Sequence, residues 1–219
     1  MKKMNRIIVL SLFIVVLFTL SPITNASENS SNEKVVLSEI IVKIQENGTD
    51  AAIASKLAEK LVNGELLDCD NPNAEPVSIS QYLIGNDMVT YSLYADGSSM
   101  TVSLSGGTST IGSGYVNWTG RLAKAVSSST TFQYNIDYTF LNGGNDYISR
   151  VYNKKIIVIY GSFSNDILSV IKSTENINGP AHGKLSAKLD YTIPPITGYG
   201  SLSVYVGNDN AYAVFNDFQ

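Results

Sequence analysis

Residues 130–142 (TTFQYNIDYTFLN) most constrain what this chain can fold into, because apolar and polar side chains alternate along them. Side chains on a β-strand point to opposite faces in turn, whereas a helix would spread the same rings around its circumference. The pattern therefore predicts a strand with one buried aromatic face. The residues expected on the buried face are Phe132, Tyr134, Ile136, Tyr138 and Phe140. Those expected on the exposed face are Gln133, Asn135 and Asp137.

A period of two recurs through residues 77–219, with turns rich in Gly, Asn and Pro and no helical pattern between them. Eight or nine short strands at this spacing are typical of antiparallel sandwiches and barrels. We therefore expect a mainly β chain in which residues 77–219 form an antiparallel β-sandwich or a barrel-like domain. Residues 105–114 (SGGTSTIGSG) are expected to be a mobile loop within it.

A β-hairpin is predicted around Asp96 and Gly97, because this dipeptide favours a two-residue turn. Such a turn places Tyr91 opposite Val102. In that register the apolar residues of both strands share one buried face. The other residues expected on this face are Val89, Leu93, Met100 and Leu104.

Before the β-domain, residues 35–64 predict a small helical hairpin, since apolar residues recur there at helical spacing. Asp50 can cap the second helix, and Gly64 is expected to end it. The β-branched residues of the first segment leave a strand as the alternative there. Residues 27–34 are polar and are expected to be a disordered lead-in. Residues 65–76 contain two prolines and are expected to be a turn-rich linker.

The first 26 residues have the layout of a secretory signal peptide, with basic residues before an apolar run at 7–20 and small residues before Ala26. A 14-residue helix spans only about 21 Å, which is shorter than the ~30 Å hydrocarbon core of a bilayer. We therefore expect cleavage after Ala26 and a secreted, extracellular protein with no stable membrane anchor afterwards.

Charge excludes some partners. Removal of residues 1–26 leaves 12 basic against 19 acidic residues, a net charge of −7. Nucleic acids and anionic lipids require a positive surface, so neither is an expected partner. No cofactor-binding motif is found in the sequence, and no cofactor is expected.

Three short blocks resemble a known family. They are NGELLD at 63–68 with NP at 71–72, GGNDYI at 143–148, and YVGN at 205–208. Together they resemble a family of small secreted proteins of Gram-positive bacteria whose function is uncharacterised. The resemblance covers most of the mature chain and implies a secreted, β-rich protein with an N-terminal helical element. It implies no catalytic residues, and Cys69 and Asp70 depart from the family pattern.

Catalytic and metal-binding motifs are weak. His182 is the only histidine and lies in a turn-rich segment, without a Gly-x-Ser-x-Gly motif elsewhere. The single cysteine, Cys69, can form no internal disulfide; whether it stays free or pairs between chains is left open. Asp68, Asp70 and Asn73 have the spacing of a calcium loop but lack its Gly and distal Glu. No catalytic or metal-binding residue is therefore predicted.

Aromatic residues outside the alternating pattern are the candidate surface contacts. They are Trp118, Tyr94 and Tyr205. We interpret the chain as a secreted, non-enzymatic β-domain that binds an extracellular or cell-envelope partner. The alternative is a membrane-active, toxin-like or bacteriocin-like protein, because strands rich in Ser, Thr and Gly also suit a β-pore; a small hydrolase is less favoured.

Export generates the first test. Mass spectrometry of the protein recovered from the medium should find Ser27 at its N-terminus, because the small residues that end at Ala26 suit signal peptidase. Recovery of a chain with intact Met1 in the membrane fraction would contradict the prediction.

Overall fold

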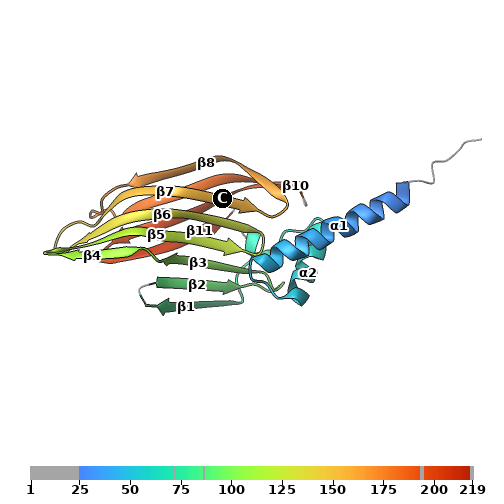
Figure 1. Cartoon of the computed structure of the whole chain (residues 1–219), viewed down its shortest axis with the longest axis horizontal. Helices are drawn as coiled ribbons and strands as arrows, with labels where there is room; N and C mark the ends of the chain where they lie inside the picture. Colours follow the sequence, from blue (N-terminus) through green and yellow to red (C-terminus); the bar gives the residue numbers. More distant parts are fainter. Residues whose placement is uncertain (1–24, 72, 86, 193–194, 218–219) are drawn as a thin grey trace, which may run out of the picture.

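The structure is a computed structural model that describes residues 25–71, 73–85, 87–192 and 195–217. In these residues two α-helices and one 3-10 helix precede eleven β-strands (Figure 1). The helical elements are α1 (Asn25–Glu46), α2 (Ala51–Val62) and η1 (Asp68–Asp70). The strands are β1 (Ser78–Ile84), β2 (Asp87–Leu93), β3 (Ser99–Ser105), β4 (Thr108–Gly112), β5 (Tyr115–Ser127), β6 (Thr130–Leu141), β7 (Tyr147–Val158), β8 (Gly161–Lys172), β9 (Ala181–Thr192), β10 (Pro195–Gly207) and β11 (Asn210–Asp217).

The strands form two separate antiparallel sheets, which confirms the predicted mainly β fold and favours the sandwich over the barrel. The large sheet has the order β1-β2-β3-β5-β6-β7, with β4 paired to β5. The small sheet has the order β11-β10-β9-β8. The helical pair lies at one end of both sheets (Figure 1).

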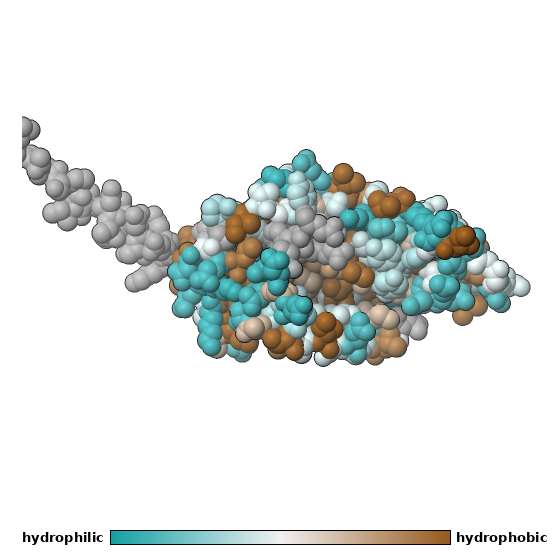
Figure 2. Space-filling model, turned by 180° about the vertical axis from the view of Figure 1, so that it is seen from behind, coloured by the Kyte–Doolittle hydropathy of each residue, from teal (hydrophilic) through white to brown (hydrophobic). Residues whose placement is uncertain are grey.

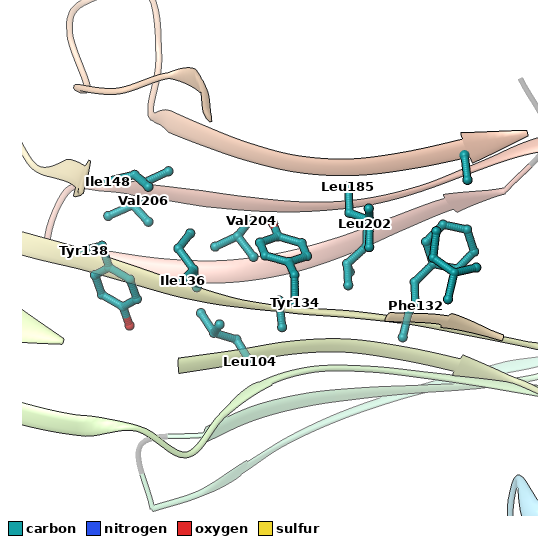
Figure 3. Close-up of a cluster of buried hydrophobic side chains, with 14 of the residues drawn as sticks. Leu104, Phe132, Tyr134, Ile136, Tyr138, Ile148, Leu185, Leu202, Val204 and Val206 are labelled. Carbon is teal, nitrogen blue, oxygen red and sulfur yellow. The ribbon is translucent and has the colours of Figure 1, made fainter. Parts of the chain in front are cut away.

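The aromatic strand β6 lies at the centre of the core, as predicted. Phe132, Tyr134 and Ile136 are fully buried, and Tyr138 is nearly so. Figure 3 shows Phe132, Tyr134 and Ile136 pointing from β6 towards the small sheet, whereas the Tyr138 ring points the other way. The residues that meet them there include Leu185, Leu202, Val204 and Val206.

The opposite face of β6 is less exposed than predicted. Asp137 is buried, while Gln133 and Asn135 are half-buried. The Asp137 carboxylate accepts hydrogen bonds from the Gly120 backbone N–H (2.6 Å) and the Tyr152 hydroxyl (3.1 Å), and it pairs with Arg150 (2.5 Å). Gly120 lies at an irregularity in the pairing of β5 with β6. The local chain path therefore gives a charged side chain enough partners to be buried.

The predicted register of the β2–β3 hairpin is wrong by one residue. Thr90, not Tyr91, lies opposite Val102. The turn has three residues instead of two: the Tyr94 N–H donates to the Ser98 carbonyl (2.9 Å), and Gly97 has φ +90°. This is the three-residue loop in which glycine takes the left-handed position. A slip of one residue exchanges the two faces of a strand.

All three β2 residues that were expected inside, Val89, Tyr91 and Leu93, are therefore on the outer face of β2. Met88, Thr90 and Ser92 instead face inwards, beside Leu104, Val102 and Met100. The segment 105–114 also differs from prediction. It was expected to be a loop, but its residues Thr108–Gly112 form β4, which pairs with β5.

The helical hairpin is confirmed. Ile40 and Ile44 of α1 pack with Leu57 and Leu61 of α2 in one buried cluster. Asp50 caps α2, since its carboxylate accepts a hydrogen bond from the Ala52 N–H (2.8 Å). α1 begins at Asn25, so residues 27–34 have a helical backbone instead of forming a disordered lead-in. Extending a helix that is already nucleated is far easier than starting one, even through polar residues.

Part of the segment predicted to be a linker, residues 67–70, packs between the helices and the sheets. Leu67, Cys69 and Asp70 are buried, and Asp68–Asp70 form the 3-10 helix. The Cys69 N–H donates to Ser98 Oγ (3.0 Å). Burial raises the pKa of the Cys69 thiol, which is enclosed instead of being available to another chain.

Asp70 joins this segment to the turn between β5 and β6. Its carboxylate accepts hydrogen bonds from Ser127 Oγ (3.2 Å) and Ser129 Oγ (2.5 Å). Burial raises the pKa of Asp70 to about 6, against the opposing effect of these hydrogen bonds. The helical pair and the sandwich are therefore linked through a buried acid.

The core assignment predicts unequal effects of neighbouring substitutions on β6. Phe132→Ala should lower the unfolding free energy by ~3–5 kcal/mol, because it removes a buried ring and leaves a cavity. Gln133→Ala on the half-buried opposite face should change it by less than ~1 kcal/mol. Urea denaturation of both variants measures the difference, and equal losses would mean that the core lies elsewhere.

Asp70 predicts a pH dependence. Its pKa is higher in the folded state than the ordinary value of 3.8, so the folded state binds the proton more tightly. The contribution of Asp70 to the unfolding free energy should therefore rise as pH falls from about 7 to about 4. Urea denaturation across this range should show wild type gaining stability relative to Asp70→Asn. Parallel pH curves for the two proteins would contradict the assignment.

Candidate functional site

The two sheets differ in width. β11, an edge strand of the small sheet, packs against β3, so β1 and β2 extend beyond it. In the part of the chain that the structure describes, β1 is exposed along its length and β2 is half-buried. Figure 1 shows this pair of strands as a projecting lower edge of the large sheet. The fold therefore has one side where the sandwich is incomplete.

A groove of about 500 Å³ follows this side of β11, and we call it the β11 groove. Its lining comes from the inner face of β1–β3, from the residue after β2 and from the edge of β11, and none of the lining residues is charged. They are Gln81, Met88, Thr90, Ser92, Tyr94, Met100, Val102, Asn210, Tyr212, Ala213, Val214 and Phe215. Five of the first six residues of β11 line it, so the groove runs along the strand.

β1 extends the floor of the groove and is exposed along its whole length. Ile79 and Leu83, which lie opposite the inward-facing Ser92 and Met88, are 62% and 69% exposed. Edge strands usually carry charges or prolines that prevent pairing with other chains, but β1 (SISQYLI) contains neither. In Figure 2 hydrophobic residues recur along the lower rim, the side on which Figure 1 draws β1.

Two smaller hollows prolong the groove towards the β4–β5 hairpin. One of about 250 Å³ shares Asn210 with the β11 groove and is lined by Leu83, Trp118 and Phe140, among others. The next, of about 190 Å³, shares Phe140 and Asp209 with it. The three hollows thus follow one another through shared lining residues, and we call this series the depression.

Trp118, a predicted contact residue, lies half-buried in the second hollow. Its ring packs on the Arg121 guanidinium (4.6 Å from the centroid) and lies 6.5 Å from the Tyr138 ring. Arg121 is buried and pairs with Asp87 (2.7 Å), and it also donates to the carbonyl of Leu104 (2.7 Å). Arg121 is therefore engaged in holding β2 and β3 to β5.

Tyr94, the second predicted contact residue, lies at the opposite end of the β11 groove, where it also packs against the helical cluster. The structure thus places Tyr94 and Trp118 at two points along one depression. Nothing in the sequence pattern around Tyr94 or Trp118 indicated that the two residues lie on the same surface.

Tyr205, the third predicted contact residue, lies on the outer face of the small sheet. Its ring stacks between His182 on β9 (4.5 Å) and Tyr212 on β11 (5.4 Å). Both faces of the Tyr205 ring are therefore occupied by neighbouring rings. Such a ladder stabilises the sheet.

His182 lies on the same outer face as Tyr205. Its Nε2 is 3.1 Å from Ser203 Oγ, and burial, with a smaller effect of Lys184, lowers the pKa of His182. Ser203 itself is buried, so this Ser–His pair does not present a nucleophile to solvent. The geometry differs from that of a serine hydrolase, which exposes its nucleophile at a cleft.

The acidic residues near two of the family-like blocks bind backbone amides. Asp146 accepts hydrogen bonds from the N–H groups of Leu141 and Asp209 (both 2.8 Å), and Glu175 accepts from those of Asp146 and Asn208 (both 2.9 Å). Burial raises the pKa of Asp146. These contacts hold the β10–β11 turn, which forms the end of the groove, against the large sheet.

The candidate calcium ligands do not converge. Asp68 pairs with Lys60 (2.7 Å), whereas Asp70 turns towards Ser127 and Ser129. Within the part of the chain that the structure describes, no group of three or more His, Cys, Asp or Glu residues could hold a metal ion. The NGELLD block thus contributes a structural ion pair.

The groove-facing residues of β2 were missed because the hairpin register was misassigned. With a two-residue turn, Met88, Thr90 and Ser92 point outwards; with the three-residue turn they face the groove. The glycine that follows Asp96 is compatible with both turns. No local signal in the sequence shows that β11 leaves these residues uncovered.

None of the helices in the described residues is long and apolar enough to cross a membrane. No family model matches this chain, and no curated protein matches it. Among solved structures, a hypothetical protein from Listeria monocytogenes EGD-e is similar, with 16% identity and a TM-score of 0.37. The similarity covers 60% of this chain and 96% of the Listeria chain. Such a distant similarity does not indicate what either protein does.

Proposed function

We propose that this chain is a secreted, non-enzymatic domain that binds an extended polypeptide segment of an extracellular or cell-envelope partner in the β11 groove. The signal peptide expected at residues 1–26 supports export. The observation on which the proposal rests is the uncharged groove between the inner face of β1–β3 and the unpaired edge of β11.

The composition of the groove favours binding. The half-buried Met88 supplies flexible, polarisable surface, and Phe215 and Tyr94 supply rings. Transfer of apolar surface from water stabilises a complex by about 25 cal/mol per Å² before the costs of association. A ligand that covers Ile79 and Leu83 would remove large exposed apolar side chains from water.

The shape of the depression favours an extended ligand over a small molecule. Small-molecule sites enclose most of their ligand's surface. Here three connected hollows border β11 and its preceding turn, and eight residues of extended strand span about 27 Å. A segment of polypeptide fits this length and lack of enclosure.

The residues that an enzyme would need support a non-enzymatic role. His182 stacks on Tyr205 away from the groove, and the Cys69 thiol is buried. The expected mature charge of −7 disfavours the membrane-active alternative on anionic bilayers. Leakage of dye from lipid vesicles distinguishes the membrane-active alternative from partner binding.

The test compares two matched substitutions on neighbouring strands. Thr90 faces the β11 groove, whereas Thr101 lies on the outer face of β3 opposite Tyr91. Thr90→Arg should weaken binding to envelope fractions of the producing cells at least about tenfold, because an unpaired charge would have to be desolvated. Thr101→Arg should leave binding unchanged. Sedimentation of N-terminally labelled protein (residues 27–219) with the envelopes measures binding.

The controls identify the partner class. Digestion of the envelopes with proteinase K should abolish binding if the partner is a polypeptide, and equal melting temperatures should show that both variants fold. Equal binding of the two variants would overturn the proposal. Release of dye from vesicles of phosphatidylglycerol and phosphatidylethanolamine by wild type would instead favour the membrane-active alternative.

A further inference from the structure

Building on that proposed function, we propose a binding mode: the partner segment adds to β11 as a fifth strand of the small sheet and covers the inner face of β2. The ligand is an extended segment whose alternate residues are apolar and uncharged, with a Lys or Arg near the end that reaches Asp209. The following observations support this mode.

The backbone edge of β11 requires a polar partner. One edge of β11 pairs with β10 along its whole length, with Asp217 opposite Gly200 at one end and Asn210 opposite Gly207 at the other. No described strand pairs with the other edge of β11. Along an antiparallel strand, alternate residues direct their N–H and C=O groups to each side. A ligand that displaces water from the groove must satisfy these groups. A second polypeptide strand has matching groups at the same spacing, whereas an acyl chain has none.

A strand added to β11 would lie along the β11 groove, whose volume is about 500 Å³. Neighbouring strands lie about 4.8 Å apart and packed sheets about 10 Å apart. β11 packs over β3, so the next strand position of the small sheet lies over β2. The large sheet extends two strands beyond β3, which provides a floor for the added strand.

The floor determines which side chains the added strand can carry. Its centre is formed by Thr90 and Ser92 of β2, with Met100 and Val102 on β3 and Gln81 on β1. Side chains that point at this surface would lose their hydration, and no lining residue could compensate a charge. Every second residue of the ligand should therefore be apolar or small, as in other strand additions.

The two ends of the depression differ in charge. At one end the exposed Asp209 borders the second and third hollows, and no described side chain bonds to its carboxylate. At the other end Tyr94 and the helical cluster close the groove. A cationic residue near Asp209 would complement this carboxylate and the acidic chain as a whole.

A second copy of this chain fits the groove less well than a separate partner. β1 is an uncharged edge strand that resembles the expected ligand in its alternation. However, it carries no cation for Asp209, and two copies with a net charge of −7 each repel one another. Self-association is therefore an outcome that the experiment must detect.

The experiment begins with selection of a phage-displayed library of random dodecapeptides on folded protein comprising residues 27–219. Thr90→Arg protein serves for counter-selection and Thr101→Arg as the matched control. We expect enriched peptides with alternating apolar residues and a terminal Lys or Arg, which bind wild type and Thr101→Arg equally and Thr90→Arg at least tenfold more weakly. Asp209→Asn should weaken peptides that carry the cation more than peptides in which it is replaced by Gln.

Backbone methylation then tests the binding mode. One enriched peptide is synthesised in two forms. One form carries N-methyl groups on its odd-numbered residues and the other on its even-numbered residues, and we call these two sets of residues the two phases. Strand addition predicts that the phase facing β11 loses at least tenfold in affinity, while the opposite phase stays within about threefold. Hydrogen exchange should show new protection of amides in β11 when the peptide is bound.

The outcomes distinguish the two proposals. Peptides that need Thr90 but tolerate methylation in both phases, without protection of β11, would overturn strand addition and leave groove binding intact. Failure to enrich any peptide that discriminates wild type from Thr90→Arg would overturn both proposals. Dimerisation of wild type that Thr90→Arg abolishes would replace the separate partner with a second copy of the chain.

Discussion

Burial of the aromatic face of β6 is the interaction on which the rest of the structure depends. Phe132, Tyr134, Ile136 and Tyr138 need an apolar partner surface, and the alternating residues of β9 and β10 supply it. The small sheet has only the width needed to cover this centre. The same requirement that completes the core therefore leaves β1 and β2 without a facing layer, and the candidate site is a consequence of unequal sheet width.

Buried carboxylates position the segments around this core. Asp137, Asp146 and Asp70 each accept hydrogen bonds from backbone N–H groups or hydroxyls and have little access to solvent. Charged acceptors form stronger hydrogen bonds than neutral ones, and a buried acid without partners would be costly. In this protein these three acidic residues hold irregular segments in place. At one such contact Asp146 of the GGNDYI block accepts a hydrogen bond from Asp209, the residue that follows the YVGN block.

The sequence was sufficient for the fold class because hydrophobic alternation is a local property. The burial of β6, the helical hairpin and the cap at Asp50 follow from residues close in the chain. The register of β2 did not follow, since Asp96 and Gly97 are compatible with two turns that differ by one residue. Residues 65–76 were mistaken for a linker because the partners of Cys69 and Asp70 are distant in sequence. The groove could not be predicted at all, because it depends on how far one sheet extends past the other.

Uneven layering also affects cooperativity. Strands covered on both faces open only with the whole domain, whereas segments with few buried contacts exchange through local opening at lower free energy. β1 packs on neither face, and its pairing with β2 is its main tie to the large sheet. The floor of the groove is therefore the part of the sheet with the weakest coupling to global unfolding. A ligand bound in the groove would slow amide hydrogen exchange in β1 and β2 before it slowed exchange elsewhere. The order of these two strands would therefore rise with the fraction of grooves that hold a ligand.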